Sequence, residues 1–149
     1  MSIESTVATY LEADATLMAT LTGGVYTSAE VGREGITRGT ASAAFGTDGY
    51  LKPCALVKQR GPVPDGMLVE QGDPAASFTQ VVEIYLYEDS GYSSIDTALG
   101  RLFALLYGHQ FSGTFPLEWI GTLDRERDEG ALKGNSMARQ DWLVASIQS

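Results

Sequence analysis

The residue types that most often carry enzyme chemistry are sparse in this chain. His109 is the single histidine, so a Ser-His-Asp triad or a histidine-rich metal site would have to be built around this one side chain. It follows a helical pattern, in Tyr107-Gly108-His109-Gln110, where an imidazole typically interacts with the carbonyl end of the helix dipole. We therefore interpret His109 as a structural residue at a helix C-terminus.

Six carboxylates form two groups that could be considered for metal binding or for acid–base catalysis. Their spacing fits no calcium-binding loop. In the second group Arg125 and Arg127 alternate with the acids, which is typical of a solvated charged turn. The sequence therefore predicts no catalytic residue, no cofactor and no metal site. The residues are Glu70 and Asp73 in the first group and Asp124, Glu126, Asp128 and Glu129 in the second.

Two further patterns could in principle bind a ligand. Gly32-Arg33-Glu34-Gly35 lacks the glycine spacing and the strand-to-helix context of a phosphate-binding loop. Five aromatic residues could form a stacking platform for bases or sugars, but without basic neighbours they favour core and interface packing. Taken with the carboxylates, these patterns indicate that the protein is not an enzyme. The aromatic residues are Tyr85, Tyr87, Tyr92, Trp119 and Trp142.

The composition limits the classes of partner and the number of domains. The chain has 149 residues, a formal net charge of −9 and no cluster of Lys and Arg, so it lacks the basic surface that grips phosphates. A chain of this length can bury one core. Cys54 is the only cysteine and reads as a small buried apolar residue. No basic segment leads into an apolar run near the start and no run of 18 apolar residues occurs, which predicts neither a secretory signal nor a membrane span.

The clearest structural pattern runs from Ser77 to Tyr107. Alternation of apolar and polar side chains predicts a strand over Ser77–Tyr87 with one buried face, and Ser93 with Asp96 predicts the start of a helix that continues to Leu106. The apolar stripe of that helix should pack on the buried face of the strand. The expected strand face is Phe78, Gln80, Val82, Ile84 and Leu86, and the expected helix stripe is Ile95, Leu99, Leu102, Phe103 and Leu106.

The remaining elements complete an α+β prediction of a single domain, with a mostly antiparallel sheet and two main helices on one face. A five-turn helix is expected over Ile3–Leu21, ending at Gly23-Gly24. The segment 32–49 is rich in Gly, Ala, Ser and Thr and is expected to be a flexible loop that a neighbouring molecule orders. Residues 60–76 are expected to form an arm. Further strands are expected at Val25–Tyr26, Pro53–Gln59, Leu117–Leu123 and Ser136–Ile147, with Met67–Glu70 either a strand or part of the arm.

This order of elements resembles the tail terminator and related head-to-tail joining (neck) proteins of long-tailed bacteriophages. The resemblance covers about two thirds of the chain, and two segments depart from it, 32–49 and the charged stretch 124–134. It is carried by the helix Ile3–Leu21 ending at Gly23-Gly24-Val25-Tyr26, the strand Pro53–Gln59, the strand end Ile84-Tyr85-Leu86-Tyr87-Glu88-Asp89, and the helix Ser93–Leu106 after Gly91-Tyr92.

The resemblance implies a structural virion protein, assembled in the host cytoplasm, that forms a homo-oligomeric and usually hexameric ring. The ring would terminate the tail tube, contact the tube protein and the connector proteins of the capsid neck, and let genomic DNA pass without specific binding. The six carboxylates, Glu70, Asp73, Asp124, Glu126, Asp128 and Glu129, are then candidates for an acidic lumen or interface. The alternatives are a head-completion or stopper component, or a soluble non-enzymatic accessory binding module.

Overall fold

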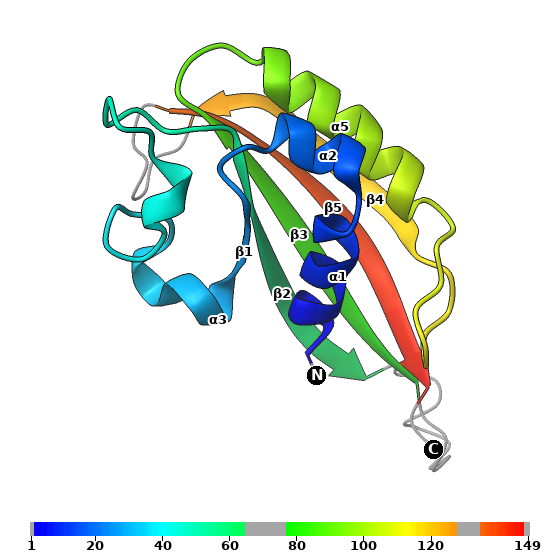
Figure 1. The fold of residues 1–149 in the computed structure, drawn as a ribbon. Coiled ribbons are helices and arrows are strands. Elements are labelled where there is room, and N and C mark those ends of the chain that lie inside the picture. Colours follow the sequence, from blue (N-terminus) through cyan, green and yellow to red (C-terminus); the bar gives the residue numbers. More distant parts are fainter. Residues whose placement is uncertain (1, 65–76, 128–134, 148–149) are drawn as a thin grey trace.

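A twisted five-stranded sheet forms the centre of the computed structural model, which describes residues 2–64, 77–127 and 135–147. The strand order across the sheet is β1-β2-β3-β5-β4 (Figure 1), and every neighbouring pair is antiparallel except β1 with β2. The predicted α+β class with a mostly antiparallel sheet is confirmed. The strands are β1 (Val25–Thr27), β2 (Cys54–Pro64), β3 (Ser77–Glu88), β4 (Glu118–Arg127) and β5 (Ser136–Ile147).

Three helices cover one face of this sheet: α1 (Ile3–Glu12), α2 (Ala15–Thr20) and α5 (Ser93–Leu106) (Figure 1). Alternate residues of β3 and β5 point toward them, as the two-residue periodicity predicts. These side chains form the main core together with apolar residues of the helices. The completely buried strand residues of this core are Ala55, Val57, Val82, Ile84, Leu86, Ala138, Trp142 and Val144.

The expected five-turn helix over Ile3–Leu21 is wrong, because the chain breaks into α1 and α2 at Asp14. The backbone of Asp14 is extended, and its carboxylate accepts a hydrogen bond of 2.8 Å from the N–H of Leu17. An aspartate that caps a helix competes with continuation of the preceding helix. Both helices still bury one face, with Val7, Leu11 and Leu17 inaccessible to solvent.

Helix α5 lies as predicted, but its buried stripe is rotated slightly from the expected one. Ala98 is fully buried, whereas Leu99 is only partly buried and Phe103 is 38 % exposed. The central positions of the stripe, Ile95, Leu102 and Leu106, are buried as expected. The rotation leaves an aromatic side chain at the margin of the core, beside β4.

The segment between β1 and β2 packs on the opposite face of the sheet, which corrects the expectation of a loop that buries little on its own subunit. It contains α3 (Ser28–Val31) and two short 3-10 helices, η1 (Gly32–Glu34) and η2 (Ser42–Ala44). Its apolar residues are irregularly spaced, so the sequence shows no periodicity that would predict their burial. They nevertheless cover the face of β2 and β3 that points away from α1, α2 and α5. The buried members of this second cluster are Val31, Ile36, Ala41, Ala44, Leu51, Cys54, Leu56 and Tyr87.

We therefore expect residues 32–49 to resist limited trypsin digestion even in dilute isolated subunits. Arg38 is the most informative cleavage site, because its guanidinium donates a hydrogen bond of 2.8 Å to the carbonyl oxygen of Gly49 and lies over the ring of Phe45. Ile36→Asp places a charge in the second cluster and should restore cleavage at Arg38. Mass spectrometry of the fragments over time measures the rate of cleavage at Arg38. If the unmodified subunit is cleaved there as fast as the Ile36→Asp variant, residues 32–49 are not packed on their own subunit.

Two strands, β2 and β4, continue well past their expected ends, whereas β1 and β3 exceed theirs by a single residue. β2 continues through Gly61 to Pro64 with an irregularity between Arg60 and Val63, because prolines are tolerated where a strand lies at a sheet edge or a bulge. β4 continues to Arg127, so the stretch after Leu123 is paired strand rather than the predicted charged turn. The expected arm beyond residue 64, including Met67–Glu70, lies outside the described residues.

An ion pair joins α2 to α5 and predicts a specific pH dependence. The Arg101 guanidinium donates two hydrogen bonds to the Asp14 carboxylate, of 2.9 and 2.6 Å. These bonds, helped by the N–H of Leu17, lower the pKa of Asp14 from 3.8 to about 2. Because the folded pKa is depressed, the stabilisation is complete above the unfolded value and is lost as the pH falls toward 2.

Asp14→Asn should therefore unfold more easily than the wild type at neutral pH, and the difference should shrink between pH 4 and pH 2. The asparagine can still cap α2, so the comparison isolates the charge. Urea unfolding at several pH values measures the difference, with Glu12→Gln, an exposed carboxylate at the end of α1, as the matched control. A difference that stays constant over this pH range would contradict the ion-pair account.

Candidate interaction surface

Two of the six predicted acidic residues are described by the structure, and both lie on β4. Asp124 and Glu126 are exposed, on a strand that forms one edge of the sheet. Glu70, Asp73, Asp128 and Glu129 lie outside the described residues. The structure thus brings Asp124 and Glu126 to one sheet edge, and their place in a ring lumen stays a prediction.

The second half of β4 contacts the start of α5 through residues at and just after a bulge in the strand. The register shifts between Leu123 and Glu126, and Arg125 has a φ of +54°. Its guanidinium lies 2.7 Å from the Asp96 carboxylate and over the ring of Tyr92, whose hydroxyl donates to the carbonyl oxygen of Glu126 at 2.6 Å. Bulges commonly re-aim a side chain in this way. The bulge therefore separates a tethered half of β4 from an open half, Glu118–Leu123.

Four aromatic side chains form a partly exposed group beside this open half, which we call the aromatic cluster: Phe103 of α5, Tyr107 just after it, Trp119 of β4 and Trp142 of β5. The Phe103 ring centroid lies 5.0 Å from that of Tyr107 and 5.8 Å from those of Trp119 and Trp142. Trp142 is fully buried, while Tyr107 is 65 % and Trp119 46 % exposed. The cluster therefore runs from the core outward to the surface, and its exposed members are held in place by packing.

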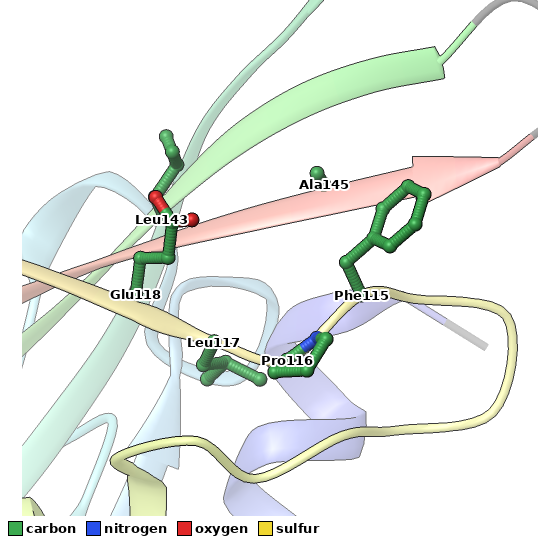
Figure 2. Close-up of a pocket in the computed structure, with 6 residues that line it drawn as sticks. All are labelled: Phe115, Pro116, Leu117, Glu118, Leu143 and Ala145. Carbon is green, nitrogen blue, oxygen red and sulfur yellow. The ribbon is translucent and has the colours of Figure 1, made fainter.

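A groove of about 350 Å³ lies at the beginning of β4 and along β5 (Figure 2). The backbone N–H of Phe115 donates to the carbonyl oxygen of Ala145 at 2.9 Å, which holds one wall against β5. The lining is largely apolar, with one carboxylate from Glu118, so it suits an apolar side chain better than a reacting polar substrate. The lining residues are Phe115, Pro116, Leu117, Glu118, Leu143 and Ala145.

A network of charged side chains lies on the sheet face away from α5, and it accounts for the burial of Glu83. Glu83 is 8 % exposed, and its carboxylate lies 3.4 Å from the guanidinium of Arg139 and 3.9 Å from that of Arg60. Arg139 also lies 3.0 Å from Asp141. Because the buried acid is paired with cations, as buried charges usually are, we interpret this network as part of the scaffold.

His109 follows α5, as predicted, and its ring contacts are with aromatic residues. The imidazole stacks on Tyr10 with a centroid distance of 4.1 Å and meets the edge of Phe111 at 4.6 Å. Tyr10 in turn donates a hydrogen bond of 3.0 Å to the carbonyl oxygen of Leu105. His109 therefore joins α1 to the end of α5.

The described part of the chain contains no group of three or more His, Cys, Asp and Glu side chains arranged to hold a metal ion. No helix in the described ranges has the length and apolar character needed to cross a membrane. The surface feature that stands out is apolar: among the residues whose side chains the structure describes, the exposed aromatic residues Phe103, Tyr107 and Trp119 pack on one another.

The sequence predicts only part of this surface. The sequence predicted core and interface packing for Trp119 and Trp142, and the structure confirms core packing for Trp142. The sequence also placed Phe103 in the buried stripe, whereas that side chain is 38 % exposed. The missed signal is the spacing of Phe103 and Tyr107, four residues apart and therefore neighbours on one helical face. Ile120 was also hard to place, because the register shift between Trp119 and Gly121 breaks the strand alternation.

Comparison with known proteins gives a similarity of fold. No family model and no curated protein matches the chain. Among solved structures, a chain of one described as "Virion of native gene transfer agent (GTA) particle" is similar with a TM-score of 0.56 and 17 % sequence identity. The similarity covers 98 % of this chain and 93 % of that chain, so the two share their architecture over nearly their whole lengths.

Proposed function

We propose that this protein is a structural component of a phage-like particle, which forms a ring that terminates the tail tube and joins it to the neck of the capsid. The observation that carries the proposal is the similarity of fold, over 98 % of the chain, to a chain of a gene transfer agent virion. The order of helices and strands that resembles tail terminators points to the same class.

The surface of the described residues supports a role in assembly. Large exposed apolar side chains that pack on one another are typical of interaction sites, and here Phe103, Tyr107 and Trp119 do so where the end of α5 meets the open half of β4. The groove beside Phe115 adds an apolar recess on the same edge. A subunit of a ring must present such a surface to its neighbours or to the tube.

The charge of the chain supports a conduit for DNA. A net charge of −9 repels a polyanion, so DNA can pass without the counterion release that makes basic channels adhesive. In this proposal the exposed acids Asp124 and Glu126 face the lumen, together with Glu70, Asp73, Asp128 and Glu129. Tube and connector proteins contact the two open ends of the ring.

Native mass spectrometry and negative-stain electron microscopy of the purified protein test the ring. The subunit mass is 15.9 kDa, and we expect a discrete assembly of about six copies with a central opening. A single-chain mass at every concentration, combined with a single copy per particle, would overturn the ring and favour a monomeric accessory module.

A further inference from the structure

The end of β4 carries one residue more than the strand with which it pairs. Leu123 lies opposite Arg139 of β5, but the next aligned pair is Glu126 with Met137. Three steps along β4 therefore match two steps along β5, which is the pattern of a β-bulge. Because the side chains of a strand alternate between the two faces of a sheet, one extra residue exchanges the faces of the residues that follow it.

The bulge decides which face of the sheet the last side chains of β4 share. In a regular strand Glu126 would lie opposite Ser136, which is buried on the same face as Ala138 of the main core. With the bulge, Glu126 lies opposite Met137, which packs against the second cluster on the other face. The side chain of Arg125 is turned toward α5 instead.

The charges at the start of α5 favour the bulged arrangement. The Arg125 guanidinium lies 2.7 Å from the carboxylate of Asp96, in the first turn of α5. In a regular strand, Asp124 and Glu126 would both lie on the face that α5 covers, near this same carboxylate, and like charges placed together repel. The bulge therefore replaces a repulsion with an attraction.

The bulge also has costs, so the bulged and the regular register compete. Arg125 has a φ of +54°, a left-handed conformation that residues with a Cβ rarely adopt. The extra residue is also left out of the ladder of backbone hydrogen bonds. Contacts at the surface offset these costs. The guanidinium pairs with Asp96 and lies over the ring of Tyr92, whose hydroxyl donates a hydrogen bond of 2.6 Å to the carbonyl oxygen of Glu126. Exposed contacts of this kind are individually weak, so a small change decides the register.

We propose that the end of β4 is a register switch, held in the bulged register by the contacts of Arg125 with Asp96 and Tyr92 and of Tyr92 with Glu126. When these contacts are lost, β4 pairs regularly beyond Leu123, and the Glu126 carboxylate moves from the face away from α5 to the face that α5 covers. The side chains of Arg125 and Asp96 are 59 % and 43 % exposed, so a charged molecule that competes for either of them releases the bulge. The switch belongs to the single subunit and does not depend on the proposed ring.

Disulfide trapping reports the register of the two strands. Residues directly opposite each other in antiparallel strands have Cα atoms roughly 4.5–5.5 Å apart, which suits a disulfide, whereas side chains on opposite faces point apart. In the otherwise unmodified protein, Glu126→Cys/Met137→Cys should oxidise with glutathione disulfide roughly tenfold faster, or more, than Glu126→Cys/Ser136→Cys. Cys54 is fully buried, and burial raises the pKa of its thiol to about 12, so it should not react in the folded protein.

Loss of the surface contacts should reverse this preference. In the Tyr92→Phe/Asp96→Asn background, the cysteine pair at 126 and 136 should oxidise faster than the pair at 126 and 137. Tyr107→Phe/Glu12→Gln makes the same chemical changes at exposed positions away from the bulge, and it should keep the original preference. Asp96→Glu retains the anion and should keep it as well.

Circular dichroism and urea unfolding identify variants that remain folded. Asp96→Asn alone, a small change of an exposed side chain, should weaken the preference for the pair at 126 and 137, and it replaces the double variant if that variant does not fold.

Three results would each overturn the inference in a different way. Equal oxidation of the two pairs in the unmodified background would mean that the bulged register is not preferred. An unchanged preference in folded Tyr92→Phe/Asp96→Asn would mean that these contacts do not hold the bulge. Loss of both disulfides in that variant would mean that the strand end detaches instead of changing register. Every measurement is made on single subunits, so these results leave the proposed ring to its own test.

Discussion

Replacing Trp142 by alanine is expected to lower the free energy of unfolding by about 3–5 kcal/mol, the range for removal of a large buried aromatic side chain. Trp142 is completely buried, and its indole N–H donates a hydrogen bond of 2.9 Å to the side-chain carbonyl of Gln140. The substitution opens a cavity and also leaves the Gln140 oxygen without this donor in the core. The loss is a large fraction of the stability of a typical domain, about 5–15 kcal/mol.

Urea denaturation of the Trp142→Ala variant measures this effect. Leu143→Ala on the same strand is the matched control, because Leu143 points to the opposite face and is only partly buried. Leu143→Ala should lower the free energy of unfolding by clearly less than Trp142→Ala. A change below about 0.5 kcal/mol for Trp142→Ala, the range of exposed substitutions, would mean that β5 does not lie at the centre of the core.

Replacing the two β4 acids Asp124 and Glu126 by lysine should convert a protein that does not bind DNA into one that does. The unmodified protein should bind no DNA at physiological salt. The Asp124→Lys/Glu126→Lys variant places two new cations in every subunit, so an assembled ring should hold several phosphates. Each neutralised phosphate contributes about −0.9 to the slope of log K against log salt, and six to ten contacts lose about 10³–10⁵ in affinity between 50 and 200 mM salt.

Fluorescence anisotropy with labelled duplex DNA over a range of salt concentrations measures the slope. Glu126→Lys and Glu12→Lys form a matched pair of single charge reversals, because both acids are exposed but Glu12 lies at the end of α1. Only the β4 variant should retain DNA if β4 lines the lumen. Tight, salt-sensitive binding by the unmodified protein would contradict the conduit.

The sequence predicted the elements whose patterns are long and regular. The alternation over Ser77–Tyr87 and the stripe over Ser93–Leu106 identified β3 and α5 because burial of one face imposes a period on the sequence. Where a local interaction interrupts the period, prediction was wrong. Asp14 divides the first helix by capping α2, a role that the apolar pattern on either side of it conceals.

Long-range contacts explain the other differences. Residues 32–49 look like a loop because their composition is poor in large apolar residues, yet a few of them, such as Ile36 and Ala44, pack on Leu56 and Tyr87. The candidate surface was equally hard to foresee. Phe103 and Trp119 lie on successive elements, α5 and β4, and they meet because Trp119 pairs with Trp142 of β5, on which the Phe103 ring also packs.

The most direct test of the proposed function is to locate the chain in the intact particle. Particles from cells that encode the protein can be labelled with gold-conjugated antibody against the chain and imaged by electron microscopy. We predict label at a single site, the junction of the tail tube with the neck of the capsid, with several copies per particle. Label spread along the tube, or particles that contain no copy of the chain, would contradict a ring that closes the tail.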